Sequence, residues 1–166
     1  MAHINYYLDL CSETFIVNDG AVLLRLHEKY DIWTGPGGHI DPGEDANEAA
    51  IREAWEEVGI KVTLVGPKDW EKKDTPTNID LVPPLFYNRH RINATHEHAG
   101  FIFVGRSDTR EVNPQTEEDK KTTSVWVTRE ELDHLKATDH RLREETYKYA
   151  LKALELVSSG NSYLSP

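Results

Sequence analysis

Residues Gly37–Ile60 read GGHIDPGEDANEAAIREAWEEVGI, and this stretch decides what the rest of the chain can be. It begins as a loop rich in glycine and proline. Asp45 precedes Glu48 by three residues, a spacing typical of a helix N-cap with its capping-box partner. Gly59 is the kind of residue that commonly ends a helix. The pattern therefore predicts a loop and then a helix that starts at about Ala46 and stops at Gly59.

The expected helix separates apolar from acidic side chains. With about 100° per residue, the apolar side comprises Ala50, Ile51, Ala54, Trp55 and Val58. Glu53, Glu56 and Glu57 share the other side. Carboxylates at this spacing repel by about 0.2–0.5 kcal/mol per pair, and the last turn of a helix disfavours anions. A divalent cation would reverse both penalties, and oxygen ligands favour Mg²⁺ or Mn²⁺. The alternative is an acidic face that is simply solvated.

The spacing of the whole stretch is more specific than the helix alone. Its fixed positions are Gly38, Glu44, Arg52, Glu53, Glu56, Glu57, Gly59 and Ile60. This pattern resembles the Nudix box, G-x5-E-x7-R-E-U-x-E-E-x-G-U, where U is a bulky aliphatic residue. The first U position holds Ala54, which loses some packing but touches no catalytic group.

The resemblance to this MutT-like family implies a fold and a reaction. The implied fold is an α/β domain with a mixed, curled β-sheet sandwiched between helices, as a single domain over residues 1–166. The implied activity is a Mg²⁺-dependent pyrophosphohydrolase, with Mn²⁺ as a substitute. Its substrate would be a nucleoside diphosphate linked to another group, such as a nucleoside triphosphate or ADP-ribose. Binding or sensing of a nucleotide without catalysis is the alternative, and an isomerase of isoprenyl diphosphates is a third.

The resemblance also assigns roles to residues of the box. The expected metal ligands are Glu53, Glu56, Glu57 and the backbone carbonyl of Gly38. Glu57 is expected to be a ligand with a catalytic role, and Glu53 a ligand or base. Arg52 is expected to orient one of these glutamates, and Glu44 to brace the loop against the helix.

Residues outside the box complete the expected site. Family members often carry a glutamate in a loop before a late tryptophan, which points to Glu118, or its neighbour Glu117, as base or extra ligand. Arg89 and Arg91 share one face of an expected strand, where they are candidates to bind substrate phosphates. Trp33 either lines the substrate pocket or packs beneath the loop.

Histidines suggest a different metal. His96 and His98 would share a strand face, but no third nitrogen or sulfur ligand stands near them in the sequence.

Composition limits the partners. The net charge of −10 argues against binding of nucleic acid polymers or anionic membranes, which relies on Lys and Arg. Cys11 is the only cysteine, so an intrachain disulfide is impossible. No segment has the length of a membrane span, and the N-terminus lacks a signal-peptide pattern. We therefore expect a cytoplasmic enzyme with a nucleotide-type substrate. The oligomeric state is open, and a homodimer is one option.

Short apolar runs predict the other elements. The expected strands are Tyr6–Leu10, Thr14–Val17, Ala21–Leu26, Lys61–Val65, a strand after Asp80 broken at Pro83, His98–Arg106 and Ser124–Val127. The expected later helices run from Thr128 to about Leu135 and over Leu142–Val157.

Overall fold

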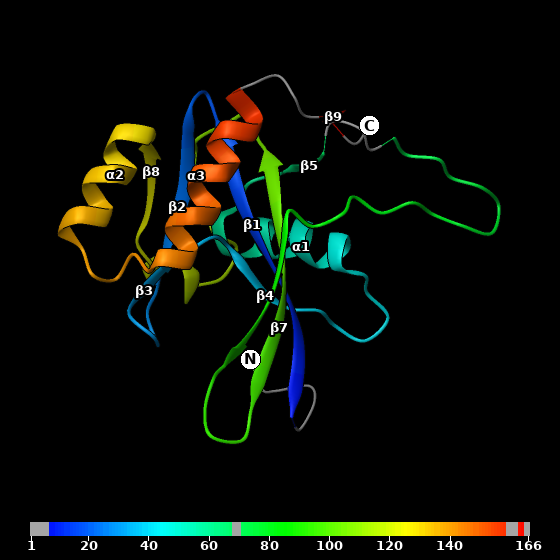
Figure 1. Cartoon of the computed structure of the whole chain (residues 1–166), viewed down its shortest axis with the longest axis horizontal. Coiled ribbons are helices and arrows are strands. Elements are labelled where there is room, and N and C mark those ends of the chain that lie inside the picture. Colours follow the sequence, from blue (N-terminus) through cyan, green and yellow to red (C-terminus); the bar gives the residue numbers. More distant parts are fainter. Residues whose placement is uncertain (1–6, 68–70, 159–162, 165–166) are drawn as a thin grey trace.

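The computed structural model describes residues 7–67, 71–158 and 163–164, and it shows an open mixed sheet with helices on both faces (Figure 1). The strands are β1 (Leu8–Asn18), β2 (Ala21–His27), β3 (Ile32–Thr34), β4 (Gly37–His39), β5 (Thr63–Gly66), β6 (Phe86–Arg91), β7 (Glu97–Arg106), β8 (Ser124–Thr128) and β9 (Tyr163–Leu164). The helices are α1 (Ala46–Val58), α2 (Arg129–Thr138), α3 (Glu144–Ser158) and the 3₁₀ turn η1 (Asp119–Lys121).

Strand β1 is the centre of the sheet. It pairs in parallel with β7 along its length, and antiparallel with β2 at one end and with β4 at residues Cys11–Glu13. The path through the sheet is β3-β2-β1-β7-β5-β9, with β8 added to β2 and β6 added to β7. Parallel and antiparallel pairs together make the mixed sheet that was predicted.

Successive side chains of a strand point to opposite faces of the sheet, and helices cover both of these faces. Phe15 on β1 joins a cluster with Ala150 of α3, whereas its neighbour Ile16 joins a cluster with Ala54 and Val58 of α1. The helices α1 and α3 therefore cover opposite faces. This layering confirms the predicted α/β architecture.

Helix α1 has the boundaries that its sequence predicts. Asp45 accepts hydrogen bonds from the backbone of Asn47 and Glu48, and the Glu48 side chain closes the capping box. Gly59 ends the helix with φ of 68°, in the left-handed region that favours glycine. A Cβ on Gly59 would lie 1.8 Å from the backbone oxygen of Asn113. The end of α1 is therefore fixed by both backbone conformation and close contact.

The apolar side of α1 was predicted only in part. Ala50, Ala54 and Val58 are fully buried, but Ile51 and Trp55 are 44% and 42% exposed. Small alanines let the helix approach the sheet closely, and this contact turns the larger side chains toward its rim. The apolar side that the helical period predicts therefore includes two side chains, of Ile51 and Trp55, that are not buried.

Other differences concern strands. The runs expected at Tyr6–Leu10 and Thr14–Val17 form one continuous strand, β1, although Tyr6 lies outside the described residues. The short strands β3, β4 and β9 were not predicted, and α2 continues to Thr138. Within the described residues, no helix combines the length and the apolar character that a membrane span requires.

Candidate active site

The acidic side of α1 lies against two glycines of β4. A Cβ on Gly38 would lie 2.3 Å from Oε1 of Glu53, and the backbone N–H of Gly37 donates to Oε2 of Glu57 at 2.9 Å. A Cβ on Gly37 would lie 2.3 Å from the backbone oxygen of Ser12 on β1. The glycine pair is therefore enclosed between β1 and the helix. At Gly37 the clash is with backbone, so only glycine fits there, whereas a side chain at Gly38 would displace the Glu53 carboxylate.

Arg52 connects the glutamates of the box. Its guanidinium donates to both carboxylate oxygens of Glu44, at 2.8 and 2.9 Å, and to Glu53 at 2.8 Å. It also donates to Glu56 at 3.2 Å and to the backbone oxygen of His39 at 2.9 Å. Arg52 thus joins the loop before α1 to the helix and fixes the direction of the Glu53 carboxylate.

Arg25 was not identified from the sequence. Nη1 of Arg25 lies 3.2 Å from Oε1 of Glu57, and Nη2 lies 2.5 Å from Oδ1 of Asp119. Arg25 is only 8% exposed and stands 94 residues before Asp119. An arginine within the apolar run Ala21–Leu26 was the available signal, because buried charges are normally paired. Its partners could not be read from local spacing.

The long loop before β8 is attached to the end of α1. The backbone N–H of Asn113 donates to the backbone carbonyl of Val58 at 2.9 Å, and the backbone N–H of Gln115 donates to the backbone carbonyl of Glu56 at 2.8 Å. These bonds satisfy carbonyls that a helix end leaves without partners. Further along the same loop, Asp119 contacts Arg25, whereas Glu118 is exposed beside it.

Negative charge exceeds positive charge in this cluster. Two guanidiniums, of Arg25 and Arg52, meet five carboxylates, of Glu44, Glu53, Glu56, Glu57 and Asp119. Burial raises the pKa of Glu57 to about 8, although Arg25 and the Gly37 N–H oppose this shift. Burial also raises the pKa of Glu53. Oxygen donors with excess negative charge fit a hard divalent cation, and Glu53, Glu56, Glu57 and the Gly38 carbonyl would hold it.

Glu13 adds a titratable group next to the glycine loop. The backbone N–H of Gly35 donates to its Oε1 at 2.8 Å, yet burial raises the pKa of Glu13 from 4.5 to about 7. Between these two values the folded protein holds a proton that the unfolded chain releases, so stability falls as pH rises. We expect Glu13→Gln to reduce this fall by about 1–2 kcal/mol between pH 5 and 7.5.

Urea unfolding of the metal-free protein at both pH values measures this effect. The difference between variant and wild type gives the contribution of Glu13 to the pH dependence of stability, because other buried carboxylates such as Glu57 are present in both proteins. Glu28→Gln, on an exposed turn, serves as the control and should keep the wild-type pH dependence. Identical pH dependence in Glu13→Gln and wild type would contradict the assignment.

The structure places Trp33 in the core. It is 5% exposed, its indole N–H donates to Asp139 at 3.0 Å, and the Arg141 guanidinium stacks over its ring. This is the packing alternative. These contacts fit the packing role of Trp33, and its contact with substrate stays an untested prediction.

Arg89 and Arg91 are not brought together with the box. Both lie on β6, are exposed, and pair with Glu97 of β7. Strands β7 and β1 separate β6 from β4 in the sheet. Their expected role as phosphate contacts stays a prediction.

Comparisons with known proteins identify the family to which the chain belongs. The NUDIX domain model matches residues 14–150, and the chain therefore belongs to the NUDIX family. A NUDIX-family hydrolase from Clostridium perfringens has a similar structure, with a TM-score of 0.79 and 32% identity over 93% of this chain and 99% of that one.

Curated relatives are similar over shorter segments. An RNA pyrophosphohydrolase of Roseobacter denitrificans is 32% identical over 57% of this chain and 59% of its own length. An asymmetrical bis(5'-nucleosyl)-tetraphosphatase of Caenorhabditis elegans is 35% identical over 46% of this chain and 60% of its own. The chain thus spans less than two thirds of the length of these relatives.

Proposed function

We propose that this protein is a divalent-metal-dependent hydrolase that cleaves a phosphoanhydride in a nucleoside diphosphate linked to another group. One observation carries the proposal: Glu53, Glu56 and Glu57 share one side of α1, where Arg52 binds the first two and the glycine backbone of β4 lies against Glu53 and Glu57. Membership of the NUDIX family supports the reaction class. Mg²⁺ is the proposed metal, with Mn²⁺ as a substitute.

The residues of the site would act by position and charge. When bound, a divalent cation neutralises charge on the anhydride oxygens and makes a bound water a better nucleophile. Arg52 holds Glu53 and Glu56, while Arg25 and the Gly37 N–H hold the two oxygens of Glu57. Such fixed carboxylates reduce the reorganisation that the reaction would otherwise require.

The linked group is chosen by parts of the chain outside the box. Relatives named an RNA pyrophosphohydrolase and a bis(5'-nucleosyl)-tetraphosphatase support polyphosphate-bearing nucleotides. A nucleoside triphosphate and ADP-ribose are the candidates from the sequence. The net charge of −10 disfavours extended contact with a nucleic acid polymer, so we favour small nucleotides. A cytoplasmic location and a single domain over residues 1–166 stay predictions.

A substrate panel tests the proposed function. The panel contains nucleoside triphosphates, a dinucleoside tetraphosphate, ADP-ribose and a short 5'-triphosphorylated RNA, each with Mg²⁺, with Mn²⁺ and with excess chelator. We expect metal-dependent release of phosphate, pyrophosphate or a nucleoside monophosphate from at least one small nucleotide. Tight nucleotide binding without turnover would instead favour the non-catalytic sensing module.

We propose Glu118 as the general base, with its neighbour Glu117 and a role as an extra ligand as the alternatives. It stands next to Asp119, which contacts Arg25 beside Glu57. Loss of a general base typically costs about 10²–10⁴-fold in rate, so we expect Glu118→Gln to lower kcat by at least about a hundredfold. Glu117→Gln tests the other candidate, which is exposed in the same turn and pairs with Lys120. Wild-type activity of Glu118→Gln would exclude Glu118 as the base, and a loss in Glu117→Gln alone would assign the role to Glu117.

A further inference from the structure

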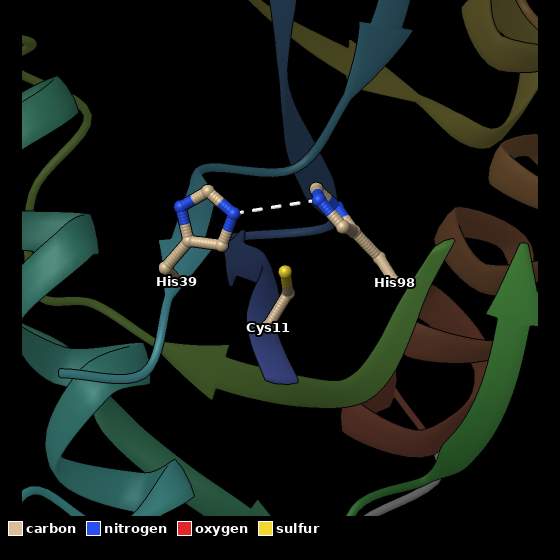
Figure 2. A group of neighbouring side chains, drawn as sticks. All are labelled: Cys11, His39 and His98. Atoms are coloured by element: carbon tan, nitrogen blue, oxygen red, sulfur yellow. Dashed lines mark hydrogen bonds between the residues drawn. The ribbon is translucent and has the colours of Figure 1, made fainter. Parts of the chain in front are cut away.

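Three neighbouring strands bring one cysteine and two histidines together outside the acidic cluster. Cys11 of β1 is the cross-strand partner of His39 on β4. On the other side of β1, the parallel register places Cys11 opposite Gly100 and Asp9 opposite His98 of β7. Figure 2 shows a ring nitrogen of His39 directed toward a ring nitrogen of His98, with the Cys11 thiol directed toward the space between the two rings. The sequence alone lacked this third ligand, because His39 and Cys11 are distant from His98 along the chain.

The spacing of these side chains suits a tetrahedral metal ion. Nε2 of His39 lies 3.4 Å from Nε2 of His98, and one ligand atom from each of Cys11, His39 and His98 lies within 4.8 Å of the others. Zinc bonds of about 2.0–2.3 Å to nitrogen and sulfur place neighbouring ligand atoms about 3.3–3.6 Å apart in a tetrahedron. The two nitrogens already have this separation. The Cys11 sulfur lies within 4.8 Å of both nitrogens.

Asp9 supplies negative charge beside the three ligands. It is fully buried, and its Oδ2 lies 3.3 Å from Nε2 of His39 and 3.3 Å from Nε2 of His96. Asp9, His96 and His98 also form a second group with ligand atoms within 4.8 Å. The two groups meet at His98. A carboxylate in this position partly offsets the charge of a bound dication.

We propose that Cys11, His39 and His98 form a binding site for a tetrahedral transition-metal ion of the Zn²⁺ class, distinct from the acidic site on α1. Nitrogen and sulfur donors select such an ion over Mg²⁺, which requires oxygen ligands. The rival interpretation is a network of hydrogen bonds among Asp9 and the histidines that holds no metal. Binding has a cost, because burial and the nearby Asp9 carboxylate raise the pKa of the Cys11 thiol to about 12. The ion displaces that proton, so its affinity rises with pH.

The position of the site gives the ion a structural role. It joins β4 to β1 and β7, and β4 carries the glycine pair that touches Glu53 and Glu57. The backbone oxygen of His39 also accepts the hydrogen bond from Arg52. A zinc ion there would fix the backbone on which the acidic site is built. The proposal does not depend on the hydrolase function, since binding is measured without any nucleotide.

Zinc binding to the full chain without an affinity tag tests the proposal. The protein is stripped with chelator, loaded with Zn²⁺ in excess Mg²⁺ to occupy the acidic carboxylates, gel-filtered, and analysed for metal content. We expect wild type to retain about one zinc per chain. Cys11→Ser and His98→Gln, both at partly exposed positions, should each bind at least about tenfold less tightly. His134→Gln on α2 and Glu57→Gln are controls that should retain zinc.

Cobalt substitution provides a measurement that needs no variant. Co²⁺ in the site should give the intense thiolate-to-metal band and the visible spectrum of a tetrahedral centre, and Cys11→Ser should lose the thiolate band. Circular dichroism of the metal-free variants establishes that each is folded.

Three results would overturn the site. One is a wild-type protein that retains no zinc and gives no thiolate band. Another is zinc binding that Cys11→Ser leaves intact, which would move the ion to Asp9, His96 and His98. The third is zinc binding that only Glu57→Gln removes, which would place the ion in the acidic cluster.

Discussion

Glu57→Gln is expected to lower kcat by at least about a hundredfold on whichever nucleotide the panel identifies, the order seen when an electrostatic element of catalysis is removed. Glutamine keeps the size of the side chain and can still accept the hydrogen bond from the Gly37 N–H. It removes the negative charge that a cation would bind and that Arg25 contacts. The measurement is steady-state hydrolysis over a range of Mg²⁺ concentrations.

A folding defect would be distinguishable from this loss. Burial raises the pKa of Glu57 to about 8, which means that the folded, metal-free protein disfavours the charged carboxylate. At pH 8 the neutral glutamine should therefore leave the metal-free protein at least as stable to unfolding as wild type. Glu155→Gln, in an exposed ion pair near the end of α3, is the control and should keep full activity. Turnover of the Glu57 variant near the wild-type rate would refute the assigned role.

Gly59→Ala is expected to cost about 2–5 kcal/mol of unfolding free energy, the largest effect on stability among the changes considered. Two terms contribute. A left-handed backbone costs a residue with a side chain about 1–2 kcal/mol. The new methyl group would also lie 1.8 Å from the Asn113 oxygen, and such overpacking adds about 1–3 kcal/mol. Urea unfolding measures the total.

Gly20→Ala separates the two terms. Gly20 has a similar φ of +77°, but a Cβ there would meet no atom within 4 Å. We expect this control to lose only the backbone term of about 1–2 kcal/mol. Equal losses in the two variants would show that the contact between the helix end and the loop at Asn113 contributes nothing.

Local signals predicted the parts of the fold that depend on local interactions. The ends of α1 follow from a capping box and a left-handed glycine, both of which act within a few residues. The grouping of the glutamates on one side of α1 follows from the spacing of about 100° per residue in an α-helix. Strand β4 gave no such signal, because it consists of three residues, two of them glycines, and is held by contacts to β1.

The unpredicted parts of the site depend on contacts between distant segments. Arg25 and Asp119 meet only after β2 and the loop before β8 are in place, and the sequence gives no spacing that links them. The exposure of Ile51 and Trp55 depends on how closely the alanines let α1 approach the sheet. The gathering of Cys11, His39 and His98 depends on strand register. Charge and hydrophobicity of single residues do not encode these distances.

The parallel pairing of β1 with β7 has a consequence for synthesis of the chain. The whole motif, Gly38–Ile60, has left the ribosome before β7 is synthesised. Until Glu97–Arg106 is available, the edge of β1 that pairs with β7 has no strand partner. The ion pair between Arg25 and Asp119 forms later still. Contacts of this range form late in folding, because distant segments must first find one another. A nascent or truncated chain that ends before β7 would thus display every residue of the motif, but it would lack the strand that pairs with β1 and the Asp119 carboxylate that contacts Arg25.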